Sequence, residues 1–188
     1  MIKISINKVV RTLIQTDLVF LSAFGLIAPI FAVFIIEQIN GGNVKVVGFA
    51  AAIYWILKSI LQIPIGRFLD KLKGERDDLY FLITGYLLTA IVPFGYIFSY
   101  SPWHIYGLQA IYAIGMAMAI PAWAAIFTRH IDKGKEAFEW SLESSGFSLG
   151  IGITGAIGGI LVSKFGFSLV FILVGVFAII GALLPLLI

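Results

Sequence analysis

The chain has 188 residues, of which 60% are hydrophobic and 12% are charged, and its mean hydropathy is +1.03. A soluble domain of this length needs a far more polar surface, so the composition indicates that lipid surrounds the chain. Cysteine is absent, which excludes a disulfide framework and a cysteine-based metal site. The two histidines, His104 and His130, lie far apart in the sequence, and we expect neither a metal nor a cofactor.

Long apolar stretches predict six membrane crossings. A helix needs about 20 apolar residues to cross the hydrocarbon core. The stretches divide the chain into spans at about 12–36, 46–69, 79–99, 103–128, 138–163 and 167–188. Prolines within several spans are expected to kink the helices rather than end them, because neighbouring helices satisfy the freed carbonyl groups. The connections are short, so we expect one all-α integral membrane bundle over residues 1–188.

Lysine and arginine are distributed unevenly between the two sides of the predicted bundle. One side carries only Lys45 and Lys164, whereas the N-terminus and the second and fourth connections carry ten basic residues. By the positive-inside rule, both termini are expected in the cytoplasm of a multi-pass protein of the cell membrane. The basic charge therefore indicates orientation, and no nucleic-acid partner is expected. The ten residues are Lys3, Lys8, Arg11, Arg67, Lys71, Lys73, Arg76, Arg129, Lys133 and Lys135.

The second connection, "GRFLDKLKGERDD", resembles the signature loop of the major facilitator superfamily, Gly-x-x-x-Asp-Arg/Lys-x-Gly-Arg/Lys-Arg/Lys. Leu72 and Lys73 stand where that pattern has one residue, and Glu75 stands where a basic residue is common. The stretches "FGLIAPIFAVFI", "ILQIPIGRFLDK" and "GIGITGAIGGILVSKFGF" are similar to parts of the family's first, second and fifth helices. The residues that match the loop are Gly66, Asp70, Lys71, Gly74 and Arg76.

The resemblance implies one six-helix half of an alternating-access secondary transporter for small solutes, of unknown substrate. Family members usually combine two such repeats, so a second copy of the chain or a different six-helix half is expected as partner, besides membrane lipid. In the family this loop clamps the opposite half, which is the role implied for Asp70. The alternative is a solvated loop charge. We expect Gly74 to supply a backbone angle that other residues resist.

A different class of function also fits the sequence. The chain could be a non-transporting membrane protein or fragment that kept the half-transporter fold as an assembly or structural component. An enzyme is not expected, because no nucleophile–base pair or phosphate-binding loop is present in the sequence.

Small residues recur along the fifth span. Such stripes allow helices to approach closely in lipid. They could contact a second copy of the chain, or they could pack only against helices of the same chain. The stripe comprises Gly146, Gly150, Thr154 and Gly158, and a second pair comprises Gly155 and Gly159.

Lys58 is the most unusual charge within a predicted span, because charge is costly in hydrocarbon. Tyr54, Lys58 and Gln62 share one helix face at spacing four and predict a polar stripe. The lysine could bind an anionic group or exchange a salt bridge with Asp17 or Glu143. Alternatively, it forms a fixed ion pair or extends along its neighbours toward water.

Carboxyl groups provide the other candidates. Asp17 could bind a proton for coupling, or it could serve packing or capping. Asp132, Glu136, Glu139 and Glu143 form an acidic line at the start of the fifth span. The helix dipole accounts for Glu136 and Glu139 there, while Glu143 lies deeper.

The fourth span adds Gln109, Tyr112 and Met116 on one face, together with Trp123. Because the family's first and fourth helices line the central cavity, the resemblance implies that these residues touch substrate, although ordinary packing explains them equally well. Gln109 stands where many proton-coupled exporters of the family carry arginine, which argues against proton antiport.

Overall fold

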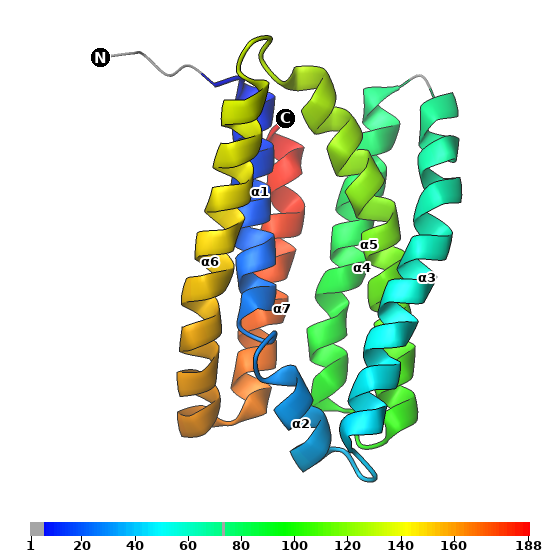
Figure 1. Cartoon of the computed structure of the whole chain (residues 1–188), viewed down its shortest axis with the longest axis vertical. Helices are drawn as coiled ribbons and strands as arrows, with labels where there is room; N and C mark the ends of the chain where they lie inside the picture. The colour runs from blue at the N-terminus through cyan, green and yellow to red at the C-terminus, as the bar shows by residue number, and fades with distance from the viewer. Residues whose placement is uncertain (1–5, 73) are drawn as a thin grey trace.

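A computed structural model describes residues 6–72 and 74–188, and every regular element within them is helical (Figure 1). Lys3 and Lys73, two of the ten basic residues above, lie outside the described residues. The elements are α1 (Lys8–Gly25), α2 (Phe31–Gln38), α3 (Val44–Lys71), α4 (Glu75–Ile97), α5 (Pro102–His130), α6 (Glu136–Phe165), α7 (Phe167–Leu183) and the 3-10 turn η1 (Leu184–Leu187).

Five of these helices are long and apolar enough to cross a membrane: α3, α4, α5, α6, and α7 continued through η1. The crossing expected at 12–36 is instead divided into α1 and α2 by turns at residues 26–30. Pro29 lies in this break, where it lacks a backbone donor and restricts the residue before it. Pro64, Pro93 and Pro121 lie inside helices, as predicted. The chain is a multi-pass membrane protein, and the sixth crossing stays a prediction.

The helices form two groups joined along one side. Helix α1 packs against α6 and α7, helix α5 packs against α3 and α4, and α4 contacts α7 to join the groups. Figure 1 shows α6 and α3 at opposite edges of the bundle, with α1 and α5 between them. Only 11% of the apolar segment of α3 and 6% of that of α6 are buried, against 44–50% for α4, α5 and α7. The edge helices therefore leave large apolar faces uncovered.

The contact between α4 and α5 depends on two glycines that face each other. A Cβ atom added at Gly85 would overlap the carbonyl oxygen of Gly115, and one added at Gly115 would overlap Thr89 and the carbonyl oxygen of Gly85. The missing side chains let the two backbones approach closely, as small residues commonly do where helices pack in a membrane.

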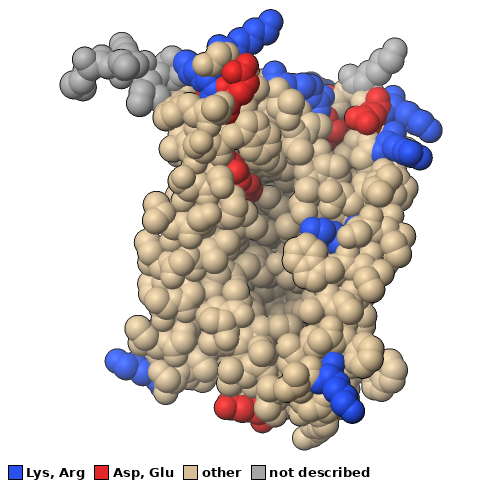
Figure 2. Space-filling model, viewed as in Figure 1, with Lys and Arg blue, Asp and Glu red and all other residues tan. Residues whose placement is uncertain are grey.

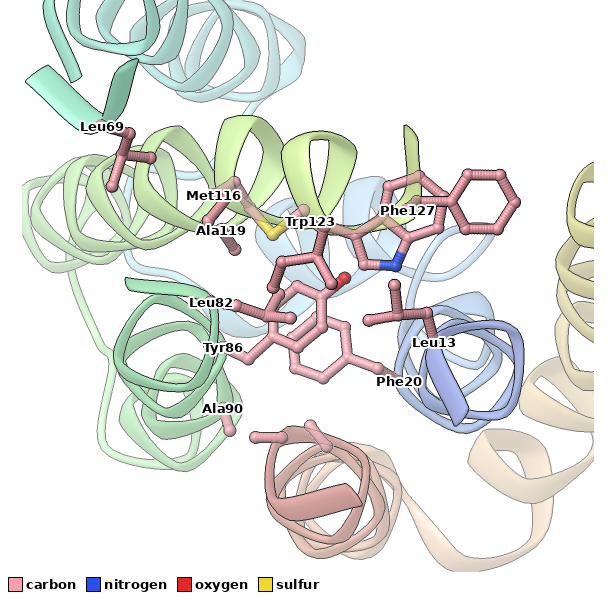
Figure 3. Close-up of a cluster of buried hydrophobic side chains, with 14 of the residues drawn as sticks. Leu13, Phe20, Leu69, Leu82, Tyr86, Ala90, Met116, Ala119, Trp123 and Phe127 are labelled. Atoms are coloured by element: carbon pink, nitrogen blue, oxygen red, sulfur yellow. The ribbon is translucent and has the colours of Figure 1, made fainter. Parts of the chain in front are cut away.

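One buried core cluster contains stacked aromatic rings among aliphatic side chains (Figure 3). Phe20 of α1 stacks on Tyr86 of α4 with ring centroids 3.9 Å apart. Trp123 stacks on Phe127 within α5 at 4.7 Å. These rings fill the space between α1, α4 and α5 and hold the polar atoms of Tyr86 and Trp123 inside the bundle.

Charge gathers at the two ends of the molecule (Figure 2). We call the end that carries the start of α1 and the α3–α4 and α5–α6 connections the basic end. There Arg129 forms an ion pair with the buried Asp78, and Nε2 of His130 lies 3.3 Å from Oε1 of Glu75. In the α5–α6 connection, a hydrogen bond from Lys135 holds the pKa of the Asp132 carboxyl below its ordinary value.

Candidate functional site

The face that carries α3, α1, α5 and α6 is hollowed between its two edges (Figure 2). A cavity of about 290 Å³ lies on this face, between the break in the first crossing and α5. Most of its lining is apolar or aromatic, which is typical of sites for small molecules. The lining includes Phe24, Ala28, Phe31, Tyr96, Gln109, Tyr112 and Ile151.

Two of the residues predicted on the fourth span meet in this cavity. Gln109 is buried, and its Nε2 atom donates a hydrogen bond of 3.2 Å to the hydroxyl oxygen of Tyr96. The ring of Tyr112 contacts Phe24 of α1 and Tyr54 of α3, at centroid distances of 5.2 and 4.6 Å. Tyr112 thus links both helix groups across the hollow. Substrate contact by either residue stays a prediction.

Met116 and Trp123 occupy a different place from Gln109 and Tyr112. Both belong to the buried core cluster and do not line the 290 Å³ cavity. The packing alternative therefore describes their surroundings better than the substrate role that the resemblance implied.

Lys58 is half-buried on α3 and has no ion pair within the described residues. Its Nζ atom lies 4.4 Å from the ring centroid of Trp55 and 5.7 Å from that of Tyr54. Lys58, Gln62 and Trp55 line an open groove of about 310 Å³. The cation is therefore held against aromatic rings, and neither Asp17 nor Glu143 neutralises it.

Asp17 and Glu143 meet each other instead. Both are buried, and the two carboxyl groups lie within hydrogen-bonding reach across the α1–α6 contact. The hydroxyl group of Tyr86, on α4, donates a hydrogen bond of 2.7 Å to Oδ1 of Asp17. Tyr86 was not predicted, because a tyrosine in an apolar span gives no signal that distinguishes a site from the core.

Glu139 is fully buried, in contrast to the solvated first-turn acid that the helix dipole would explain. The backbone N–H of Asp132 donates a hydrogen bond of 3.2 Å to its Oε2 atom. Its Oε1 atom has no hydrogen-bond partner within the part of the chain that the structure describes. Glu136 of the same turn is exposed, as expected for that position.

A family model supplies the remaining evidence. The model described as Major Facilitator Superfamily matches residues 18–188, nearly the whole chain. The chain belongs to the major facilitator superfamily. A search of curated proteins gave no match. Superfamily members are transporters rather than enzymes, so membrane transport is the general function that the family membership carries.

The superfamily loop lies at the basic end, beside a second and larger cavity of about 700 Å³ between α3 and α5. Gly66, Asp70, Pro121 and Arg129 contribute to its lining. Asp70 is exposed and has no ion pair within the described residues, while Arg129 is paired with Asp78. The carboxylate of Asp70 is thus free to meet a group outside the described chain.

The other loop residues have ordinary local roles. Lys71 ends α3 and Arg76 follows the start of α4, and both are exposed. Gly74 precedes α4 with φ −116° and ψ 127°, which is extended backbone open to any residue. The expectation that Gly74 supplies an unusual backbone angle is therefore wrong.

The glycines of α6 divide into two sets. A side chain at Gly150 would overlap Ser22 of α1, and one at Gly158 would overlap the backbone of Leu26. Gly155 lies close to the break after α1. These three therefore pack within the chain. Gly146 and Gly159 have no atom of another described element within 4 Å of a Cβ position, so they are still candidates for contact with a second bundle.

Proposed function

We propose that this chain is one half of an alternating-access secondary transporter for small solutes. In this proposal six crossings place the basic end in the cytoplasm of the cell membrane, and a second copy of the chain supplies the other half. The proposal rests most of all on the superfamily match over residues 18–188. Transport then uses the rocking of two bundles around a site near the middle of the membrane.

The polar groups on the hollowed face support a transport site there. Lys58 and Gln62 line a groove on α3, while Gln109 and Tyr112 line the cavity beside α5. Charge in contact with acyl chains is costly, so a lysine without a carboxylate partner among the described residues suits a water-filled space or an anionic group of a solute. The Asp17–Glu143 pair is the candidate coupling group, because a carboxyl group can take up and release a proton.

The uncovered helices support pairing with a second bundle. Since α6 and α3 stand at opposite edges of one face, a two-fold axis along the membrane normal brings α3 of one copy against α6 of the other, twice (Figure 1). Asp70 at the basic end of α3 then approaches the first turns of α6 in the second copy, where the positive end of a helix dipole favours a carboxylate. Gly146 has no side chain and faces open space, so it would allow α3 of the second copy to approach α6 closely.

Alternating access can be tested without knowledge of the substrate, because the chain contains no native cysteine. Ala28 lines the cavity near the break in the first crossing, and Ala124 lines the cavity at the basic end. We expect Ala28→Cys and Ala124→Cys to react with a membrane-impermeant maleimide from opposite sides. Modification of one position should slow the labelling of the other when both are present.

The control is Gly107→Cys, at an open position of α5 outside both cavities. Its labelling should not depend on the state of Ala28→Cys. If modification of one cavity cysteine left the labelling rate of the other unchanged, the result would contradict the transport cycle and favour a static membrane scaffold.

A further inference from the structure

Three carboxyl groups follow one another along the contact between α1 and α6. Asp17 and Glu143 form the buried pair, and Glu139 lies four residues before Glu143 on the same helix. Residues at this spacing lie one turn apart on one face, with Cβ atoms about 5–6 Å from each other. Glu139 is the member nearer to the basic end, since α6 begins there at Glu136. The three groups therefore lead from the inside of the bundle toward its basic end.

A hydrogen bond between two carboxyl groups requires a proton on one of them, because an ionised carboxylate can only accept. Two ionised carboxylates in contact would also repel each other strongly in a buried site. The Asp17–Glu143 pair therefore holds one proton when its carboxyl groups are in contact. If the pair serves coupling, this proton needs a path to water.

Unpartnered polar atoms mark such a path. Oε1 of Glu139 has no hydrogen-bond partner within the described residues, although the side chain is fully buried. Nε1 of Trp123, on α5, is likewise unpartnered there, and the residue is only 8% exposed. Figure 3 shows its indole nitrogen directed toward α1, on the side where Leu13 lies. A buried donor or acceptor without a partner is unfavourable, so each of these two atoms can accommodate a polar species. The hydroxyl oxygens of Ser22 and Thr89 are also unpartnered within the described residues.

Other charged groups at this end are exposed or already engaged. Lys8 and Arg11 of α1 and Lys133 of the α5–α6 connection are exposed. Asp132 donates its backbone N–H to Glu139, and its carboxylate is hydrogen-bonded to Lys135. On α5, Arg129 and His130 face Asp78 and Glu75 of α4. Helix α4 contributes Tyr86 to Asp17, and α7 contains no ionisable residue. Among the described residues of α1 and α6, Glu139 is therefore the buried carboxyl group between the pair and the basic end.

We propose that Glu139 relays protons between the Asp17–Glu143 pair and the water at the basic end of the bundle. In one step the O–H bond at the pair breaks and an O–H bond forms at Oε1 of Glu139. In the next step the O–H bond at Glu139 breaks and the proton passes to water. The route uses carboxyl groups of α1 and α6 and needs no cation at position 109. The inference rests on the proposed transport function, because only a coupled transporter has a use for this proton.

The test follows the carboxyl C=O stretch of protonated acids by infrared spectroscopy in the full chain reconstituted in lipid, after a rapid change in bulk pH. Asp17→Asn or Glu143→Gln should remove the band of the buried pair. Glu139→Gln should retain the band but slow its response to pH by at least about tenfold, because a proton carrier has been removed. Glu139→Asp should restore most of the rate. The matched control is Glu136→Gln, at the exposed position one turn earlier, which should leave the rate unchanged.

Two results would overturn the relay: the absence of a pair band in the unmodified protein, and an unchanged rate in Glu139→Gln. If Glu139→Gln fails to fold, Glu139→Asp becomes the deciding variant. We expect its rate to be close to that of the unmodified protein, and a rate at least about tenfold slower would contradict the proposal. The cysteine labelling of Ala28 and Ala124 tests transport separately. If the infrared variants behave as expected but the labelling of the two cysteines does not alternate, the transport cycle is rejected while proton transfer through Glu139 is supported.

Discussion

The hydroxyl group of Tyr86 donates a hydrogen bond of 2.7 Å to Oδ1 of Asp17, although the two residues lie 69 positions apart in the chain. The bond joins α4, in one helix group, to α1, in the other. It also fixes Asp17 at the place where α6 brings Glu143 to the same carboxyl group. The polar centre of the bundle is therefore built from three helices.

Replacement of Tyr86 by phenylalanine tests this bond. The variant keeps the ring that stacks on Phe20 but removes the donor to Asp17. We expect the free energy of unfolding in detergent to fall by about 1–3 kcal/mol, because a buried acceptor loses its partner. Tyr96→Phe is the control. It removes a neutral acceptor from Gln109, but both residues line the 290 Å³ cavity, where water can replace the lost hydroxyl, so the cost should be about 1 kcal/mol or less. An unchanged stability of Tyr86→Phe would show that the bond does not hold the groups together.

The close approach of α4 and α5 predicts a strong effect of one methyl group. Gly115→Ala places a Cβ atom against the backbone of Gly85, and we expect destabilisation by about 1–3 kcal/mol. Gly107→Ala, at an open position of the same helix, should be neutral or slightly stabilising because alanine favours the helix. Thermal unfolding of the two variants in the same detergent provides the comparison. Equal effects at both positions would contradict the proposed packing.

The ion pair between Arg129 and Asp78 predicts a further stability difference. Asp78 is only 3% exposed, so Arg129→Ala leaves a buried carboxylate without its partner. Because Arg129 itself is partly exposed to solvent, we expect a loss of about 1–3 kcal/mol, less than for a fully buried pair. Arg76→Ala is the control, since Arg76 is exposed and has no ion pair among the described residues. A double variant with Asp78→Asn should recover part of the loss.

Lys58 should matter for function more than for stability. Its Nζ atom contacts aromatic rings but no carboxylate within the described residues, so Lys58→Ala should change the free energy of unfolding by less than about 1 kcal/mol. We expect the same variant to alter the alternating labelling of Ala28→Cys and Ala124→Cys. A large loss of stability with normal labelling would assign Lys58 to the scaffold.

The sequence predicts the long helices well because a membrane-spanning helix is a continuous apolar stretch, which can be seen in the sequence without knowledge of the tertiary structure. It did not predict the break at residues 26–30, since a proline in lipid can kink a helix or divide it. The meeting of Asp17 with Glu143 was also beyond the sequence. Both positions were noted, but the rotation and depth of α1 against α6 depend on packing, including the contacts at Gly150 and Gly158.

Glu139 shows the same difficulty in another form. A glutamate in a first helical turn is usually explained by the helix dipole, as it was here. The side chain is instead fully buried, and Asp132 of the preceding connection donates its backbone N–H to it. This contact belongs to the tertiary structure and leaves no pattern in the sequence.

Pairing with a second copy is the central claim, and cysteine cross-linking in native membranes tests it most directly. The account predicts that Asp70→Cys and Ser141→Cys, combined in one chain without native cysteines, form a product of twice the monomer mass. Asp70→Cys combined with Ser163→Cys, near the opposite end of α6, should give none. Products of monomer size alone for the first pair would contradict the account.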